Sequence, residues 1–540
     1  MISSVFADEK LLFAPAIPKS DAIPTIFAFP NKYTVGITSL GYQVIWASLA
    51  MRTDVKVSRL FTDIKEPLPR KPELMGLSLS WELDYINILN LLESLNIPIR
   101  AQIRSDKHPL VFGGGPVLTA NPEPFADFFD VILLGDGEQL LDNFIDVYKQ
   151  VRDSNRKTKL VTLAQVPGIY IPSLYHVEYH KLDGMIASIK PISPGIPSVV
   201  QKQTYQGNIL SASTVVTRRA IWDNIYMIEM VRSCPEMCRF CLASYLTLPF
   251  RTASLDDSLI PSIEKGLKVT NRLGLLGASV TQHPEFGELL NYINHPQYNH
   301  VRLSIASVRT NTVTHKLAYT LAQRGTQSLT IAIESASERV RQIINKKLHK
   351  EEIIQAAVNA KQGGLLALKL YGMVGIPGEE SEDLDAMVAM MKEVRNAAPG
   401  LRLTLGCSTF VPKSHTPFQW FGLNKKSEKK LQYLHNKLRP QGIDFNPESY
   451  NWSVIQTLLS RGDRRLLKLL ETTRDFGNSL GSYKRAFKEL KGQIPTLDFY
   501  VHQDWKPDMI LPWNHLKGPL TKSTLLRHLA DAKLKSEQKS

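Results

Sequence analysis

The sequence predicts an α/β fold, in which parallel sheets are followed by a mainly helical part. Short apolar runs of strand length alternate with helical patterns up to about residue 175 and again between 221 and 420. This alternation indicates parallel sheets covered by helices. Three of the four cysteines directly follow a strand-like run, and sites on such sheets lie where strands end. At about 150 residues per domain, a chain of 540 residues predicts three or four domains.

Residues 1–175 are expected to form a doubly wound domain. The predicted strands end in glycine-rich turns, at Gly113-Gly114-Gly115 and at Gly135-Asp136-Gly137. Glycines at the carboxyl ends of parallel strands let a ligand approach the backbone, although tight turns alone would also explain them. The predicted strands are Glu73–Ser80, Pro109–Phe112 and Phe129–Leu134, and the predicted helices are Tyr42–Met51 and Asp84–Leu95.

Residues 176–220 are expected to form a connector, because prolines punctuate an extended stretch. Residues 221–420 again alternate, and six strand–helix units predict a partial (β/α)6 barrel of the TIM type. Its strands are expected to end at Arg232, Val280, Ala306, Ile333, Val374 and Cys407, the second one running from Leu275 to Val280.

Residues 421–540 are expected to be a mainly helical extension with many basic residues. Arg461, Arg464 and Arg465 could meet phosphate, but the leucines around them favour a helix whose arginines form a solvated polar face.

Composition indicates an ordinary globular protein, with 43% hydrophobic and 21% charged residues. Four cysteines are too few for a disulfide scaffold, which fits a reducing compartment. Asp8, Glu9 and Lys10 interrupt the only apolar N-terminal stretch, so we expect no signal peptide. No uncharged apolar run of about 18 residues occurs, so we expect no membrane span. Together these features predict a cytoplasmic protein.

The net charge of +14 can favour nucleic acid or acidic ligands. It can also reflect a solvated basic surface, which we favour because no long Lys/Arg block occurs before the C-terminal quarter. Nucleic acid stays open as a partner.

The stretch Met227–Arg251 contains Cys234, Cys238 and Cys241, spaced Cys-x3-Cys-x2-Cys. Thiolates are soft ligands that suit iron–sulfur clusters or zinc. Three of them can hold three irons of a 4Fe-4S cube, whereas ordinary ferredoxin clusters use four cysteines. The fourth iron is then open to a substrate or cosubstrate. Zinc is the alternative, but zinc motifs usually carry a second cysteine pair, and this sequence has none.

This spacing, with Phe240 just before the last cysteine, resembles the radical S-adenosylmethionine (SAM) superfamily, and the resemblance covers most of the chain. The first 175 residues resemble the cobalamin-binding-like, flavodoxin-like domain that precedes many radical SAM modules. The resemblance implies a 4Fe-4S cluster on the three cysteines, S-adenosylmethionine as cosubstrate, and a flavodoxin- or ferredoxin-type reductant. It also implies reductive cleavage of SAM to a 5′-deoxyadenosyl radical that modifies a substrate.

Cobalamin stays open as a further cofactor. Domains that displace the lower axial base of cobalamin carry an Asp-x-His-x-x-Gly motif, and the nearest match here is Asp106–Val111, with valine in the place of glycine. It also precedes a late strand instead of following an early one. We therefore expect His108 to be an exposed loop residue and not an axial ligand.

The resemblance also implies which residues contact SAM. The loop after the second barrel strand would face the methionine amino group, the third strand the carboxylate and ribose, the fourth a polar contact, and the turn after the fifth the adenine. The residues at these places are Gly277, Ala278, Ser279, Ser304, Arg309, Glu334, Ser335, Gly375, Ile376 and Gly378. The last three would serve equally well as a strand-to-helix turn. Cys407 is expected to be a small buried side chain, with a second thiol site as the alternative.

Three functions remain open from the sequence. The first is a radical SAM enzyme acting on an unidentified substrate, and the second is its RNA-directed form, a methylating or methylthiolating enzyme. The third is a non-catalytic iron–sulfur or zinc-binding protein.

Overall fold

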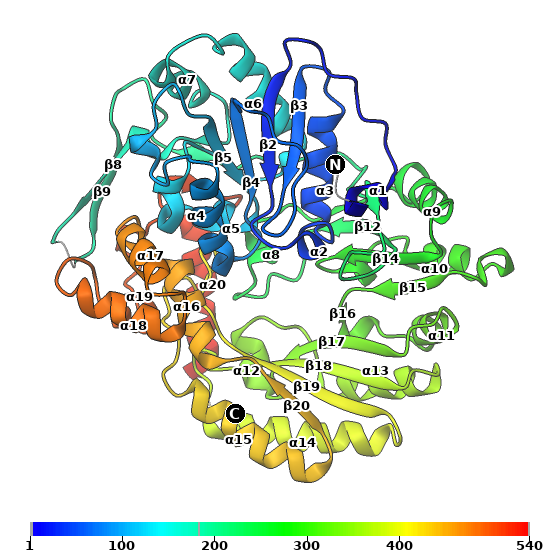
Figure 1. The fold of residues 1–540 in the computed structure, drawn as a ribbon. Coiled ribbons are helices and arrows are strands. Elements are labelled where there is room, and N and C mark those ends of the chain that lie inside the picture. Colours follow the sequence, from blue (N-terminus) through cyan, green and yellow to red (C-terminus); the bar gives the residue numbers. More distant parts are fainter. Residues whose placement is uncertain (1–3, 182–183, 538–540) are drawn as a thin grey trace.

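The computed structural model describes residues 4–181 and 184–537 and contains the two parallel-sheet regions that the alternating pattern predicts (Figure 1). Residues 1–3 and 538–540, at the ends of the expected terminal parts, and residues 182–183 of the expected connector lie outside the described residues. Within the described residues, no helix is long and apolar enough to cross a membrane.

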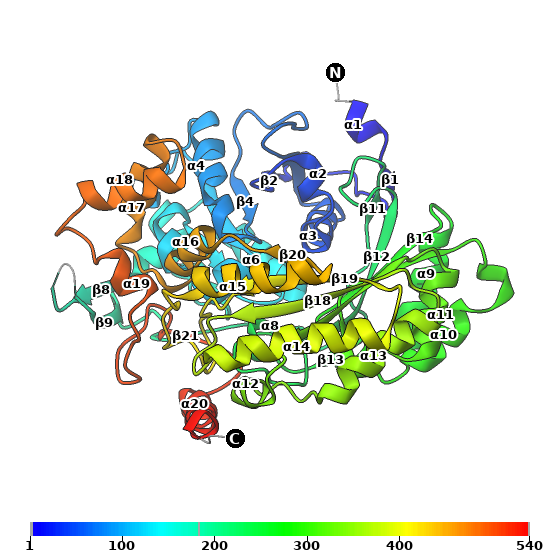
Figure 2. The same ribbon diagram turned by 90° about the horizontal axis from the view of Figure 1, so that it is seen from below.

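The N-terminal sheet has six strands in the order β3-β2-β4-β5-β6-β7, parallel except for the edge strand β7. Its first five strands follow the flavodoxin-like order 2-1-3-4-5, which confirms the predicted doubly wound fold. Helices α3 and α6 pack together on one face and α4 lies on the other (Figures 1 and 2). The strands are β2 (Ile23–Ala28), β3 (Val55–Leu60), β4 (Leu74–Ser78), β5 (Leu110–Gly114), β6 (Val131–Leu133) and β7 (Ile169–Tyr170); the helices are α2 (Tyr33–Gly36), α3 (Leu40–Ala50), α4 (Tyr85–Ser94), α5 (Pro116–Ala120), α6 (Gly137–Gln150) and α7 (Arg156–Leu163).

Strands β2 and β3 were not predicted from the sequence, because β2 contains a proline and β3 contains several polar residues. Pro24 is the second residue of β2, and proline within an apolar run argues against a central strand. Arg59 of β3 is buried and forms ion pairs with Glu9 and Glu66 at 2.8 and 2.7 Å. The sequence pattern around Arg59 therefore does not show whether this arginine is buried or exposed to solvent.

All six predicted barrel strands are present, but the hydrogen-bonded ladder is interrupted once. One sheet has the order β13-β12-β14-β15, and the other has the order β16-β17-β18-β19-β20. The predicted bounds of the second strand were wrong: β14 ends at Gly277, three residues before the expected end. The strands are β12 (Ile225–Arg232), β13 (Arg251–Thr252), β14 (Arg272–Gly277), β15 (Arg302–Ile305), β16 (Val308–Arg309), β17 (Ser328–Glu334), β18 (Ala367–Val374), β19 (Arg402–Thr409) and β20 (Asp444–Pro447).

Helices cover the outer face of the barrel strands, whereas the inner face is more open. In β18 the outward-facing Leu368 and Leu370 are buried, while Lys369 and Tyr371 between them are partly exposed. Side chains alternate between the two faces of a strand, so Lys369 and Tyr371 point into the barrel. The helices of this region are α8 (Leu242–Tyr245), α9 (Ile260–Leu267), α10 (Phe286–Ile293), α11 (His315–Gln323), α12 (Glu338–Ile343), α13 (Lys350–Gln362) and α14 (Ser381–Ala397).

Cys407 lies on the outer face of β19, where it packs with the helices and is buried. Burial raises the pKa of its thiol well above the ordinary value. The structure therefore agrees with a small buried side chain at this position.

The segment between the two sheets pairs with both ends of the chain. Strands β8 (Tyr175–Tyr179) and β9 (Ile186–Pro191) form a hairpin. Strand β10 (Val200–Gln201) pairs with β21 (Leu516–Lys517), and β11 (Val215–Val216) pairs with β1 (Lys10–Leu11), which follows α1 (Ser4–Ala7).

The C-terminal extension is mainly helical, as predicted, but it begins with a further helix–strand unit, because β20 follows α15 and adds to the barrel beside β19. Helices α16 to α18 then share one hydrophobic core with the N-terminal sheet, and this core also includes Ile343 of α12 and Met373 of β18. Tyr483 of α18, for example, hydrogen-bonds Tyr85 of α4 at 3.0 Å. The helices are α15 (Ser427–Leu438), α16 (Tyr450–Arg461), α17 (Leu466–Asp475), α18 (Leu480–Glu489), α19 (Leu497–Val501) and α20 (Lys522–Glu537).

The expectation that Arg461, Arg464 and Arg465 form a solvated polar face was wrong. Arg461 is fully buried and donates to the backbone carbonyls of Tyr500 and Gln503. Arg464 forms an ion pair with Glu123 at 2.7 Å, and Arg465 pairs with its neighbour Asp463 at 2.6 Å. The partners of Arg461 and Arg464 come from segments distant in sequence, so helical periodicity could not reveal them.

We predict that Arg461→Ala destabilises the fold by about 3 kcal/mol or more, because it leaves buried carbonyls without donors and removes a cation from the face of Trp505. Urea unfolding followed by circular dichroism measures this. Arg474→Ala is the matched control, since the carboxylates of both its partners are exposed, and it should cost less than about 1 kcal/mol. Equal unfolding midpoints for the two variants would contradict the assigned role of Arg461.

Candidate functional site

The three-cysteine loop follows β12 and is fixed by hydrogen bonds from a distant part of the chain. Asn345, just after α12, donates to the carbonyls of Glu236 and Met237 at 3.1 and 2.9 Å. Arg239 donates to the carbonyls of Gln342 and Ile343 at the end of α12. The loop also contains backbone turns with positive φ, at Met237 for example. These hydrogen bonds stabilise the conformation of the loop, which forms few hydrogen bonds within itself.

Cys234, Cys238 and Cys241 line one pocket of ≈ 140 Å³ at the carboxyl ends of the barrel strands. Burial raises the pKa of Cys238 to about 12, and it also raises the pKa of Cys241. Buried thiols of this kind become thiolates when a metal binds, because the metal supplies the compensating positive charge.

The donor set fits an iron–sulfur cube better than a single metal ion. Among the described residues, no group of three or more His, Cys, Asp or Glu side chains gathers as the ligands of one ion do. In a cube each thiolate binds a different iron, so the sulfurs surround a larger space. Three thiols around a common pocket meet that requirement.

Two ion pairs border the same pocket. Arg309 pairs with Glu236 of the cysteine loop at 2.9 Å, and Lys346 pairs with Glu334 at 3.3 Å. Burial by itself lowers the pKa of Lys346, but the neighbouring Glu334 and Cys238 outweigh burial, so the pKa of Lys346 is raised. Lys346 is therefore a buried ammonium group beside a cysteine of the loop.

Of the ten positions expected to contact SAM, four line the pocket with the cysteines: Ala278, Ser279, Arg309 and Glu334. Gly277 lies directly before them at the end of β14, where its backbone approaches β12 so closely that a Cβ atom would lie 2.7 Å from the carbonyl oxygen of Val231.

The remaining expected positions lie outside this pocket. Ser304 is an exposed residue of β15, on the strand face opposite the buried Leu303. Ser335 is buried, and its hydroxyl accepts from the N–H of Ser337 at the start of α12. Gly375, Ile376 and Gly378 form the turn after β18, where both glycines have positive φ and the N–H of Gly375 donates to Glu379 at 2.7 Å.

Six pocket residues were missed by sequence reasoning: Glu236, Ser244, Ser307, Val308, Ala332 and Lys346. Ala332 pairs with Tyr371 on the inner face, but an irregularity between Ala332 and Glu334 interrupts the alternation of β17, so strand periodicity alone does not link the two. Lys346 carries no local signal, since only the packing of α12 against the cysteine loop brings it to Cys238.

Two sequence models of known protein families match this chain. The model described as "Radical SAM proteins, N-terminal" matches residues 46–172, and the model described as "Radical SAM superfamily" matches residues 228–391, which include the three cysteines and the whole pocket.

The chain belongs to the radical SAM superfamily. It is therefore an enzyme, and the cofactors of its family are a 4Fe-4S cluster and S-adenosylmethionine. The three-cysteine pocket has the donor set that such a cluster requires.

Among known relatives, the uncharacterized protein MJ0966 of Methanocaldococcus jannaschii is 28% identical over 85% of this chain and 93% of that protein. The uncharacterized methyltransferase PH0819 of Pyrococcus horikoshii is 22% identical over 67% of this chain and 75% of its own length. Among solved structures, the radical SAM methyltransferase TsrM from Kitasatospora setae, with cobalamin and a [4Fe-4S] cluster bound, matches with a TM-score of 0.48 and 14% identity over 74% of this chain and 77% of that one.

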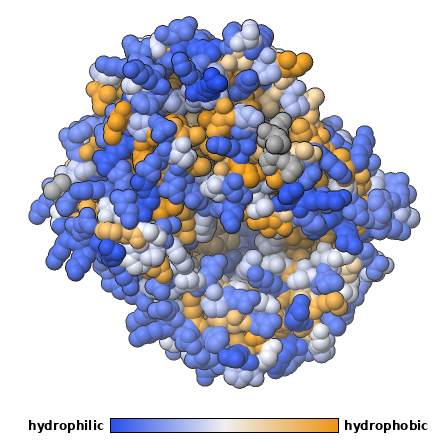
Figure 3. Space-filling view, viewed as in Figure 1, coloured by the Kyte–Doolittle hydropathy of each residue, from blue (hydrophilic) through white to orange (hydrophobic). Residues whose placement is uncertain are grey.

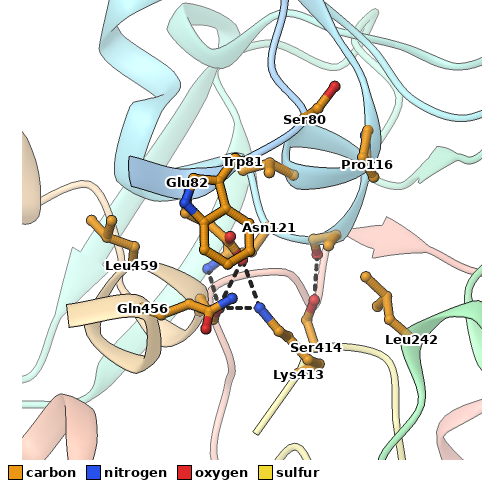
Figure 4. Close-up of a pocket in the computed structure, with 13 residues that line it drawn as sticks. Ser80, Trp81, Glu82, Pro116, Asn121, Leu242, Lys413, Ser414, Gln456 and Leu459 are labelled. Atoms are coloured by element: carbon orange, nitrogen blue, oxygen red, sulfur yellow. Dashed lines mark hydrogen bonds and ion pairs between the residues drawn. The ribbon is translucent and has the colours of Figure 1, made fainter. Parts of the chain in front are cut away.

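A second pocket, of ≈ 210 Å³, lies between the radical SAM domain and the carboxyl edge of the N-terminal sheet (Figure 4). Leu242 of α8 contributes from the cysteine-loop side, and Trp81 and Pro116 contribute from the sheet. Glu82 and Lys413 form an ion pair at 2.6 Å in its wall. This volume is below the ~300–1,000 Å³ of usual small-molecule sites.

His108 lies at the opposite edge of the N-terminal sheet. It precedes the amino end of β5, about 16 Å of strand away from the carboxyl edge. Its Nδ1 accepts from the N–H of Ser105 at 3.0 Å. It is partly buried, less exposed than expected, and it does not face the second pocket.

We predict that no histidine of residues 1–175 ligates cobalt, because His108 is the only one and it lies at the wrong edge of the sheet. Absorption spectra of purified protein mixed with hydroxocobalamin should lack the bands of histidine-coordinated cobalt. The spectra of His108→Ala and of the unaltered protein should coincide. A histidine-coordinated spectrum that disappears in His108→Ala would contradict this.

Proposed function

We propose that this radical SAM enzyme holds its 4Fe-4S cluster on Cys234, Cys238 and Cys241 and binds S-adenosylmethionine in the same pocket. The observation that carries the proposal is the meeting of three thiols, Arg309 and Glu334 in one pocket at the carboxyl ends of the barrel strands. When bound, these two cofactors supply a 5′-deoxyadenosyl radical that abstracts hydrogen from an unactivated carbon. The substrate is not identified by this pocket.

Glu334 is the pocket residue best suited to orient SAM. Its Oε1 meets Lys346, whereas Oε2 has no hydrogen-bond partner among the described residues. A carboxylate oxygen only accepts, so Oε2 would receive a ribose hydroxyl or the ammonium group of the methionine moiety. The ion pair with Lys346 fixes the direction of the Glu334 carboxylate.

Arg309 acts mainly on the loop that carries the cysteines. It donates to Asn311 and to the carbonyl of Lys347, and it forms the ion pair with Glu236 between Cys234 and Cys238. A guanidinium has five N–H donors, so some remain for the carboxylate of the methionine moiety. Arg309 would thus couple the shape of the cysteine loop to SAM binding.

We favour methyl transfer as the reaction class, because the relative from Pyrococcus horikoshii is named a methyltransferase. An RNA-directed form has less support, because the three arginines considered for phosphate contact are buried or paired. Incubation with SAM labelled in its methyl group, followed by mass spectrometry of metabolites and RNA nucleosides, distinguishes these substrates.

We predict that changing Cys234, Cys238 or Cys241 to Ala removes the 4Fe-4S cluster from anaerobically reconstituted protein. Iron analysis and electron paramagnetic resonance (EPR) of the reduced protein measure this. Cys407→Ala is the matched control, because this fourth cysteine is buried on the outer face of the barrel, and the variant should keep about four irons. A variant that lacks all three loop cysteines and still binds four irons would refute the ligand assignment.

We predict that Glu334→Gln weakens the apparent affinity for SAM by about tenfold or more, since it removes a charged hydrogen-bond acceptor, while iron content stays unchanged. SAM titrations of the reduced cluster, followed by EPR, and the yield of 5′-deoxyadenosine measure the effect.

The competing account is that Glu334 only neutralises the buried Lys346. It predicts that Glu334→Gln loses stability and cluster together, and that the double variant Glu334→Gln/Lys346→Met recovers both cluster and SAM affinity. Recovery of full SAM affinity in the double variant would exclude a direct contact between Glu334 and SAM.

A further inference from the structure

The inner face of the barrel is hollow and reaches solvent. Strand β18 is the middle strand of its five-stranded sheet, yet Tyr371 at its centre is 40% exposed. Figure 3 shows a depression in the middle of this face of the molecule, between the N-terminal domain and strands β17 to β19. A side chain in the middle of a sheet stays exposed only if nothing covers that face.

One row of polar side chains crosses this inner face. Thr330 of β17 pairs in register with Lys369 of β18, and Lys369 pairs with Thr404 of β19. Paired residues of neighbouring strands point to the same side, so the side chains of Thr330 and Thr404 flank that of Lys369. All three residues are only partly buried. A Cβ atom on Gly406 would meet both Lys369 and Tyr371, which confirms that these two side chains share the inner face.

Lys369 has no carboxylate partner within ion-pair distance among the described residues, whereas its ammonium lies 4.9 Å from the centre of the Tyr371 ring. A cation over an aromatic face is held in place without being neutralised. The carboxylates nearest the cysteine pocket are already paired, Glu236 with Arg309 and Glu334 with Lys346. Asp444 of β20 pairs in register with Thr404 and continues the same row, but it is not within ion-pair distance of Lys369. Lys369 is thus a cation in the hollow that has no ion-pair partner among the described residues.

We propose that Lys369, with Thr330 and Thr404, binds an acidic group of the substrate, a carboxylate or a phosphate. The ammonium supplies the charge, and the two hydroxyls donate to the remaining oxygens of the anion. The role of this row as a substrate site rests on the proposed function, because the radical must form in the adjacent pocket.

The register also limits the size of the substrate. Tyr371 pairs with Ala332 of the pocket, and Gly372 pairs with Glu334. Lys369 lies two to three residues before these positions, which is about 7 to 10 Å along the strand. The acidic group would therefore be several bonds away from the carbon that loses hydrogen, as in a small organic acid or a phosphorylated metabolite.

The test uses the full-length, anaerobically reconstituted protein with inorganic phosphate and acetate as separate probes. Phosphorus NMR line widths measure phosphate binding, and saturation-transfer proton NMR measures acetate binding. At least one anion should bind saturably, Lys369→Met should weaken that binding by about tenfold or more, and Lys369→Arg should retain most of it. Binding of phosphate alone or of acetate alone supports the site and identifies the kind of acid.

Lys392→Met is the matched control, because Lys392 is an exposed lysine of α14, and it should bind the anion as the unaltered protein does. Binding of neither anion, or equal binding by Lys369→Met and the unaltered protein, would overturn the proposal. Iron content and 5′-deoxyadenosine formed without substrate are measured on the same samples. These two readouts should not change in Lys369→Met, so a failure of the anion site is separate from a failure of the proposed radical SAM activity.

Discussion

The site depends on hydrogen bonds that join the three-cysteine loop to the end of α12, about a hundred residues later in the chain. Asn345 and Arg239 form these bonds, the first by donating to the loop and the second by donating from it. A loop that leaves backbone groups without internal partners needs such outside partners to keep one shape. The same packing brings Lys346 to Cys238, so the loop shape and the charge around the thiols have one common origin.

The C-terminal extension completes the enclosure of this loop from two directions. Helices α16 to α18 pack on the N-terminal sheet and fix it beside the barrel. Helix α20 returns to α12 and to the outside of the cysteine loop, where Asp531 pairs with Arg239 and His528 meets the hydroxyl of Tyr245 at 2.8 Å (Figure 2). Three distant parts of the chain therefore surround the cysteine loop, of which Cys238 is buried, and this favours exclusion of water from a cluster at this place.

The two charged residues of the Glu334–Lys346 ion pair differ in how far the sequence predicts them. Glu334 ends a predicted strand, and its position at the carboxyl edge follows from the barrel pattern. Its partner Lys346 follows α12, and nothing in the local pattern separates this buried lysine from Lys347, which is exposed. A lysine is buried at a cost unless it is paired, and only the folded chain shows that the pair exists.

The sequence by itself determined the two parallel-sheet regions, the six barrel strands and the place of the three cysteines, because these depend on apolar periodicity and on ligand spacing along the chain. It did not determine β2, because proline argues against a central strand. It also did not determine the burial of Arg59 in β3 or of Arg461, since both have partners far away in sequence. The end of β14 lies three residues before its expected place, because pairing with β12 and β15 decided the bounds of this strand. Tertiary structure alone decided which expected SAM contacts share a pocket with the cysteines, because strand ends meet in space only after the sheet has formed.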